Sequence, residues 1–334
     1  MKVAIVGASG FTGLELIKII HTHPKFELSY IATTTGDTTV DVLHPALKDV
    51  VQGDVEKVDL DFIGKNCELV FLAVPHKTAM ELVSRLMKSG IKIVDLSADY
   101  RLDLDTYVAN YCEHIDSGNI ENSVYGLPEF YTEDIKKAQL VANPGCYPTS
   151  ALLALAPFAT MLKKDAPIFI DAKSGVSGAG KKCVDTTHFV TINENMFAYA
   201  PLDHRHGAEI KEKLGFLNDK ENKVHFVPHL VPITRGMLAS VYLELDENID
   251  AKSILQEYYK EHYFVRVCDE PVGMKQVSGT NFCDIYVKQD GKTLFISSAI
   301  DNLLRGASSQ AVVNANLMVG YEHDLGIPII AYAP

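Results

Sequence analysis

Apolar and polar positions follow two different patterns along the first hundred residues. Short apolar runs, typical of buried strands, cover residues 2–6, 26–32, 69–75 and 91–96. Between them lie stretches with helical spacing, such as Leu14, Ile17 and Ile20 on one face before Pro24. Strands that alternate with helices predict a parallel, doubly wound sheet.

The rhythm changes after about residue 160. Strand-like runs cover residues 167–173, 224–228, 238–245, 282–287 and 293–300, with few helices between them, and a last helix runs from 307 to about 318. Successive strands favour a mixed or antiparallel sheet. We therefore expect an α/β protein: a Rossmann-like doubly wound parallel sheet plus a second α+β domain with a mixed or antiparallel sheet.

A glycine-rich loop joins the first strand to the first helix. Gly7-x-x-Gly10-x-x-Gly13 is a variant of the dinucleotide fingerprint, whose glycines let a pyrophosphate approach the backbone at a helix N-terminus. The second strand ends in Thr33-Thr34-Thr35, where the fingerprint expects an acid that would repel a 2′-phosphate. This favours NADP(H), although no arginine is visible nearby. The loop residues expected to bind it are Gly7, Ser9, Gly10, Phe11, Thr12 and Gly13.

Composition narrows the classes of partner. The 334 residues are 47% hydrophobic and 22% charged, which is ordinary for a soluble enzyme. A net charge of −12 argues against nucleic acid and an anionic membrane surface as partners. The N-terminal strand leaves no room for a signal peptide, so we expect a cytoplasmic protein with no membrane span. The six cysteines form no C-x-x-C pair, and we expect reduced thiols and no metal.

One cysteine stands at a predicted strand-to-helix junction. An apolar run at 139–142 is followed by N-P-G-C-Y-P-T at 143–149 and an apolar helix from 150. A helix N-terminus lowers the pKa of a thiol, so Cys146 is a candidate nucleophile. The alternative is a small core residue, but a turning backbone suits that role poorly.

A second chemical cluster begins a helix that we expect to end at Gly215. Asp203 is the expected N-cap, which puts His204 and His206 in the first turn. The positive end of the helix dipole keeps an imidazole neutral, as a general base requires. His206 and Glu209, three apart, share a helical face.

Three further segments allow two interpretations each, one functional and one without a functional role. Pro75 and His76 follow a strand at its carboxyl end, where cofactors bind, although His76 is equally a surface residue. Arg101 follows another such strand and either binds a phosphate or carboxylate or pairs with Asp99 on the surface. A second glycine-rich loop at 174–182 either wraps the active site or is a flexible linker.

Together these motifs resemble the N-acetyl-γ-glutamyl-phosphate reductase family over nearly the whole chain. The resemblance rests on the Gly7–Gly13 loop, N-P-G-C-Y-P-T, D-A-K-S-G-V-S-G-A-G, H-R-H-x-x-E-I and D-N-L-L-R-G-A in order. It implies an NADPH-dependent reductase of arginine biosynthesis that acts through a cysteine thioester. Gly207-Ala208 departs from the family, in which a proline often follows H-R-H.

The resemblance also implies residue roles and boundaries. The catalytic set is Cys146, His204, His206 and Glu209, with the choice between the histidines open. The set for the acyl phosphate is Arg101, Ser97, Asn143 and Arg205. Further cofactor residues are Thr33, Pro75, Ser177, Gly178 and Asn302. Residues 1–147 with 306–334 would form the cofactor domain, and 148–305 the catalytic and oligomerisation domain of a dimer or tetramer.

Three alternatives stay open at this point. One is an aspartate-semialdehyde dehydrogenase-like reductase of another acyl phosphate. Another is a thiol hydrolase without cofactor, against which the N-terminal glycine loop argues. The third is a non-catalytic NADP-binding sensor, against which the Cys/His set argues.

Overall fold

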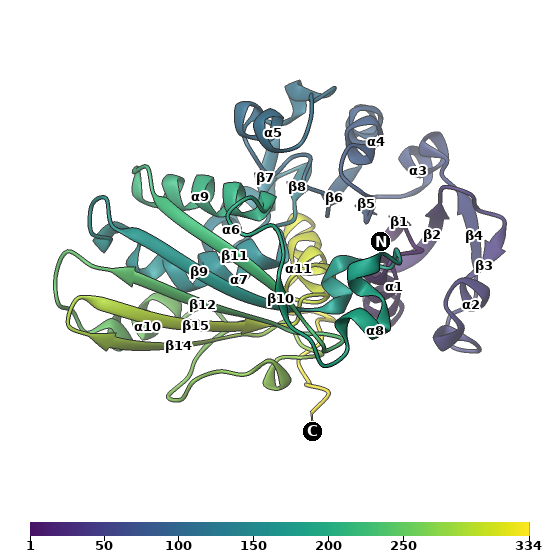
Figure 1. Ribbon diagram of the computed structural model, residues 1–334. Helices are drawn as coiled ribbons and strands as arrows, with labels where there is room; N and C mark the ends of the chain where they lie inside the picture. Colours follow the sequence, from purple (N-terminus) through teal and green to yellow (C-terminus); the bar gives the residue numbers. More distant parts are fainter. Residues whose placement is uncertain (334) are drawn as a thin grey trace. The chain divides into compact units, whose positions relative to one another are not determined.

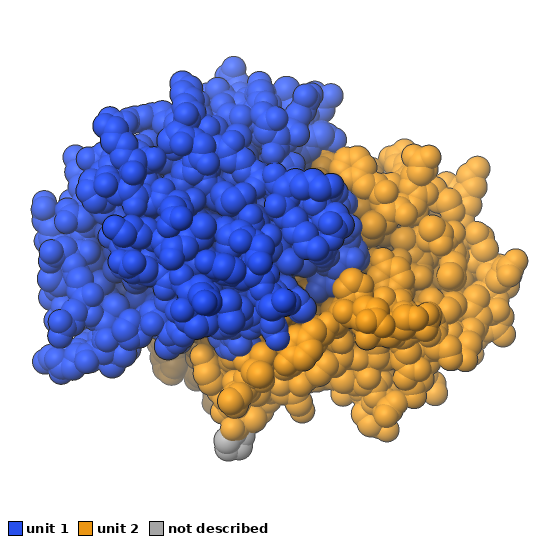
Figure 2. Space-filling view, turned by 180° about the vertical axis from the view of Figure 1, so that it is seen from behind, with its two compact units in different colours: residues 1–144, 307–328 blue, residues 145–306, 329–334 orange. Residues whose placement is uncertain are grey.

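The chain folds into two compact units in the computed structural model, which describes residues 1–333 (Figure 2). Unit 1 comprises Met1–Pro144 and Ala307–Pro328; unit 2 comprises Gly145–Gly306 and the described residues from Ile329. No helix among residues 1–333 is both long and apolar enough to cross a membrane.

Unit 1 is built on an eight-stranded sheet in the order β3-β4-β2-β1-β5-β6-β8-β7 (Figure 1). All its neighbouring strands are parallel except the antiparallel pair β3–β4. Central strands are buried on both faces, which explains their unbroken apolar sequences. The strands are β1 Lys2–Val6, β2 Glu27–Thr33, β3 Thr38–Thr39, β4 Asp54–Lys57, β5 Leu69–Leu72, β6 Lys92–Asp95, β7 Ser123–Tyr125 and β8 Leu140–Ala142.

Helices cover both faces of this sheet, as the doubly wound prediction requires. Helix α4 shows why: Ala79, Met80, Val83 and Leu86 are its buried residues, spaced to form one apolar face. Helix α11 returns from the end of the chain and packs against α1, α6 and β6. The helices are α1 Phe11–Thr22, α2 Val40–Leu43, α3 Leu60–Asn66, α4 Thr78–Leu86, α5 Leu104–Asn110, α6 Pro128–Lys137 and α11 Ser308–Met318, with 3-10 turns η1 Pro45–Leu47, η2 Met87–Ser89 and η3 Ser117–Asn119.

Unit 2 holds a seven-stranded mixed sheet in the order β10-β11-β9-β12-β15-β14-β13. Only β9–β11 and β13–β14 are parallel. Helices α7, α9 and α10 pack against its strands, and α7 is buried on nearly every side. The elements are β9 Pro167–Gly175, β10 Phe197–Ala198, β11 Lys223–Val231, β12 Met237–Glu244, β13 Val265–Val267, β14 Cys283–Asp290, β15 Thr293–Ile300, α7 Cys146–Leu155, α8 Phe189–Ile192, α9 Arg205–Asn218 and α10 Ala251–Tyr259, with η4 Ala156–Met161, η5 Val176–Ala179, η6 Asp185–Thr187 and η7 Met274–Gln276. The expected fold class is thus confirmed.

Two expected boundaries are wrong. The tail from Ile329 groups with unit 2 rather than with the cofactor unit, because the Tyr332 N–H donates to Ser278 O at 2.8 Å and its ring packs on Gly279. Helix α9 continues past Gly215 to Asn218 and ends where Asp219 takes a left-handed conformation (φ 52°).

Candidate active site

The glycine loop of unit 1 has the shape that a dinucleotide needs. Gly7 adopts φ +93°, and a Cβ there would collide with the Ala73 backbone. A Cβ on Gly13 would lie 2.6 Å from Gly7 O, so that glycine lets α1 pack against the loop. A Cβ on Gly10 would meet nothing nearer than Thr12 Oγ1 at 3.8 Å. The loop is therefore tight on its inner side and open at Gly10, which fits an approaching pyrophosphate.

The end of β2 carries hydroxyls in the place of the usual acid. Thr33 is buried and its Oγ1 accepts a hydrogen bond from Gly36 N at 3.0 Å, which closes the turn. Thr34 and Thr35 are exposed. Asp37, past the turn, lines a separate hollow. Thr33 therefore shapes this strand end through its backbone turn.

Arg101, Ser97 and Asn143 come together after β6 in unit 1. The Arg101 guanidinium is buried and donates through Nε to Asn143 O and through an Nη to Leu96 O, both at 2.7 Å. Ser97 Oγ donates to Asp95 Oδ2 at 2.7 Å, and burial raises the pKa of Asp95 to about 7. The surface-arginine alternative is therefore wrong. Arg205, the fourth residue of the predicted set, is exposed in the first turn of α9 in unit 2.

The loop after β5 in unit 1 holds the Pro75–His76 pair. Pro75 is exposed, and the half-buried His76 ring lies edge-on to Tyr111 at 5.7 Å.

Cys146 is the first residue of α7 in unit 2, as the junction predicted. Gly145 is the N-cap, and Thr149 N donates to Gly145 O at 2.9 Å to close the first turn. Cys146 is half-buried, whereas Cys67 and Cys283 are buried in the core. None of the six cysteines, which all lie in the described part of the chain, forms a disulfide. A half-buried thiol at a helix N-terminus has the setting of a reactive cysteine.

The start of α9 lies against this turn. The fully buried carboxylate of Glu209 accepts a hydrogen bond from Gly145 N at 3.0 Å, across 64 residues of sequence. The ring of Tyr147, next to the cysteine, lies 5.8 Å from the rings of both His204 and His206. The start of α9, which carries His204, His206 and Glu209, therefore packs against the first turn of α7, which carries Cys146.

The structure distinguishes the two histidines. His204, and not Asp203, is the N-cap of α9: its Nδ1 accepts from His206 N at 3.2 Å. Edge-on contacts with Tyr147, Tyr199 and Phe226 surround its ring. This burial, with the nearby Arg205 charge, lowers the pKa of His204 to about 4. His204 is thus a neutral capping residue at ordinary pH.

Residues from three distant segments of unit 2 meet around Asn302. Asn302 is buried; its Nδ2 donates to Ser177 Oγ at 3.0 Å, and its Oδ1 accepts from Gly236 N at 2.7 Å. A Cβ on Gly178 would lie 2.6 Å from Ser174 Oγ. Ser174 and Ser177 are buried, so the flexible-linker alternative is wrong for the first half of this loop.

Sequence reasoning missed Gly306. A Cβ on this glycine would lie 2.6 Å from Cys146 Cβ and 2.7 Å from Asn302 O. The D-N-L-L-R-G motif contains Gly306, but nothing local in the sequence points to a contact with a cysteine 160 positions earlier.

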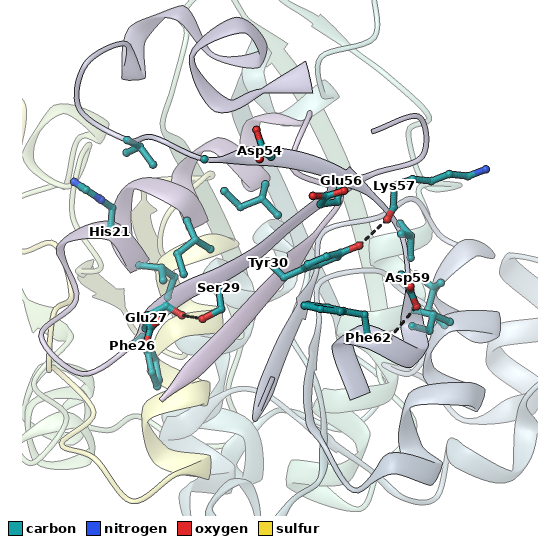
Figure 3. A pocket seen from close by; sticks show the side chains of 18 of the residues that line it. His21, Phe26, Glu27, Ser29, Tyr30, Asp54, Glu56, Lys57, Asp59 and Phe62 are labelled. Carbon is teal, nitrogen blue, oxygen red and sulfur yellow. Dashed lines mark hydrogen bonds between the residues drawn. The ribbon is translucent and has the colours of Figure 1, made fainter. Parts of the chain in front are cut away.

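A hollow elsewhere in unit 1 holds none of the predicted site residues (Figure 3). It lies along β2 and β4, where Tyr30 packs on Phe62 at 5.1 Å between ring centres and donates to Lys57 O at 2.7 Å. Carboxylates such as Glu27, Asp54 and Glu56 line it, a setting that suits neither a pyrophosphate nor an acyl phosphate. Among the described residues, no group of three or more His, Cys, Asp or Glu side chains is placed to hold a metal ion.

Comparisons with known proteins define the class. Residues 2–138 match a family model described as the NAD binding domain of semialdehyde dehydrogenase, and residues 146–302 match its dimerisation domain. An aspartate semialdehyde dehydrogenase II from Vibrio cholerae superposes with a TM-score of 0.75 at 16% identity, over 96% of this chain and 98% of that one. One from Candida albicans with NADP gives 0.73 at 12% identity, over 95% and 98%. These structures share the fold.

Closer relatives define the family. A protein named N-acetyl-gamma-glutamyl-phosphate reductase from Sulfurimonas denitrificans is 60% identical over 100% of this chain and 99% of its own length. One of the same name from Methanococcus maripaludis (strain C7) is 41% identical over 99% of both. The chain belongs to the N-acetyl-γ-glutamyl-phosphate reductase family of the semialdehyde dehydrogenases.

Proposed function

We propose that this protein reduces N-acetyl-γ-glutamyl phosphate to N-acetylglutamate 5-semialdehyde with NADPH, in arginine biosynthesis. The observation that carries the mechanism is the half-buried Cys146 at the first residue of α7, with its preceding turn held by Glu209. Such a thiol suits nucleophilic attack on an acyl carbon.

The chemistry follows from the chain's own residues. The Cys146 thiolate attacks the γ-carbonyl carbon, the bond from that carbon to the phosphate oxygen breaks, and phosphate leaves with the electron pair. A thioester remains on Cys146. The dinucleotide supplies a hydride when bound. Backbone N–H groups at the start of α7 stabilise the resulting oxyanion, and its collapse releases the semialdehyde and regenerates the thiolate.

Residues of unit 1 would bind the anionic groups. Arg101 has its guanidinium plane fixed by the carbonyls of Asn143 and Leu96, and a fixed fork suits bidentate binding of a phosphate or carboxylate. Ser97 and Asn143 shape the same turn. The exposed Arg205 of unit 2 adds positive charge beside the histidines.

The residues proposed to bind the cofactor are those predicted from the sequence. In unit 1, the loop Gly7–Gly13 would hold the pyrophosphate, Thr33 would shape the ribose-phosphate side, and Pro75 would line the nicotinamide side. In unit 2, the hydrogen-bonded pair Ser177 and Asn302, with Gly178 beside it, would contact the nicotinamide end.

The substrate assignment is tested in the reverse direction. We expect phosphate-dependent reduction of NADP⁺ with N-acetylglutamate semialdehyde, at a kcat/KM about a hundredfold or more above that with aspartate semialdehyde. NAD⁺ in place of NADP⁺ and omission of phosphate are the controls. If kcat/KM with aspartate semialdehyde is equal or higher, the proposed substrate is wrong.

His206 is the proposed acid/base, which takes the Cys146 thiol proton before the attack and gives it to the departing phosphate oxygen. His204 is not chosen, because a group with its pKa is a poor base near neutral pH. We expect His206→Asn to lower kcat by roughly 10²–10⁴-fold and to remove the acid limb of its pH profile. His204→Asn is the matched variant, since asparagine also caps helices. It should keep most activity and the same acid limb. If kcat falls more in His204→Asn than in His206→Asn, His204 is the acid/base instead.

A homodimer is the proposed assembly, formed through the face of the unit 2 sheet opposite α7. Phe169, Tyr242 and Phe295 are cross-strand neighbours there, and the first two are about half exposed. The family model for this part of the chain is described as a dimerisation domain. Tyr242→Asp should turn the dimer into monomers in sedimentation equilibrium, and an unchanged mass would exclude this face.

A further inference from the structure

A buried histidine in unit 1 contacts the glycine loop from outside the fingerprint. His44 is 5% exposed, and its Nε2 lies 2.7 Å from the carbonyl oxygen of Ala8, the residue after Gly7. A carbonyl oxygen only accepts hydrogen bonds, so the ring donates and Nε2 carries its proton. The ring therefore holds one peptide group of the proposed pyrophosphate loop.

The backbone of His44 is fixed in its turn. Its N–H donates to Val40 O at 2.8 Å at the end of α2, and its carbonyl accepts from Leu47 N at 2.9 Å in η1. Pro45 keeps the preceding residue out of the helical region, which matches the φ of −134° and ψ of 84° at His44. The ring is thus presented from a rigid turn between β3 and β4.

The other side of Ala8 is held by β2. The N–H groups of Gly7 and Ala8 both donate to Ala32 O, at 2.9 and 3.1 Å. In a trans peptide the carbonyl and the next N–H point in opposite directions. Holding Ala8 O toward His44 therefore directs the N–H of Ser9 to the opposite side. Backbone N–H groups directed outward from such a loop are what bind phosphate oxygens.

We propose that His44 is a positioning residue for dinucleotide binding, which sets the orientation of the Ala8–Ser9 peptide and so the affinity for the pyrophosphate. Without the donor, this peptide can rotate and turn a carbonyl toward the phosphates, which repels them. The inference rests on the proposed function, in that the Gly7–Gly13 loop binds NADPH.

The test compares ligands with and without a pyrophosphate on the intact protein. His44→Leu should raise the Kd of NADPH and of 2′-phospho-ADP-ribose about tenfold. The Kd of adenosine 2′-phosphate, which lacks the pyrophosphate, should change less than twofold. Equal weakening of both kinds of ligand, or an unchanged NADPH Kd, would overturn the proposal. A wild-type protein that binds no NADPH would instead overturn the proposed function.

Conservative variants separate positioning from folding. The amide nitrogen of glutamine can occupy the place of Nε2, whereas that of asparagine is too short to reach it. We expect His44→Gln to bind NADPH within threefold of wild type and His44→Asn to behave like His44→Leu. His23→Leu removes another buried histidine of unit 1, whose Nδ1 accepts from Phe26 N. It should lower the Tm without changing the NADPH Kd. A similar rise of the NADPH Kd in His23→Leu would mean that His44 affects binding only through the stability of the fold.

Discussion

Replacing Cys146 by serine should lower kcat by several orders of magnitude while NADPH still binds. The substitution keeps the size of the side chain but replaces a readily ionised thiol with a hydroxyl of far higher pKa, so the thioester cannot form at a useful rate. The glycine loop belongs to unit 1, so the Cys146→Ser protein should bind NADPH with the affinity of the wild-type protein. Steady-state kinetics and a fluorescence titration with NADPH measure the two effects.

Cys183→Ser is the matched control, since Cys183 is the exposed cysteine of the same unit. It should leave kcat unchanged. In the Cys183→Ser background, iodoacetamide should label Cys146 with a pH midpoint below the usual thiol value of about 8.5, and the acyl phosphate should protect it. A folded Cys146→Ser protein that keeps more than about 1% of the wild-type kcat would contradict the covalent mechanism.

Local patterns in the sequence predicted the elements that local forces determine. The glycine loop and the Cys146 junction each depend on a strand, a turn and a helix within some fifteen residues. Their backbone requirements are visible in Gly7, Gly13 and Pro148. The doubly wound sheet follows from the same short-range alternation.

Contacts between distant segments were beyond that kind of reasoning. Glu209 and Gly145 are 64 residues apart, and Asn302 and Ser177 are 125 apart. The N-cap of α9 is instructive, because aspartate is the commoner cap and Asp203 stood next to His204. The aromatic rings that bury His204 come from α7, β11 and the segment after β10, so tertiary packing decided between the two.

Gly306→Ala is expected to lower kcat about a hundredfold through Cys146. The added Cβ would lie 2.6 Å from Cys146 Cβ and 2.7 Å from Asn302 O, and separations under 3.0 Å force a shift. The Asn302 carbonyl is backbone, in a turn held by hydrogen bonds from Leu303 N and Leu304 N to Asp301 Oδ1. The cysteine is therefore the side that moves, and a misplacement of about 1 Å in a reacting group costs on the order of 10² in rate.

Gly118→Ala is the matched control, because a Cβ there meets nothing within 4 Å and the backbone needs no positive φ. It should keep the wild-type kcat. Gly306→Ala should also lose stability, by about 1–3 kcal/mol for overpacking, and this is measured separately by denaturant unfolding. The decisive reading is kcat for the folded variant, together with its rate of thiol labelling. A Gly306→Ala enzyme with wild-type kcat would show that Cys146 tolerates the displacement and that close approach to Gly306 does not position the nucleophile.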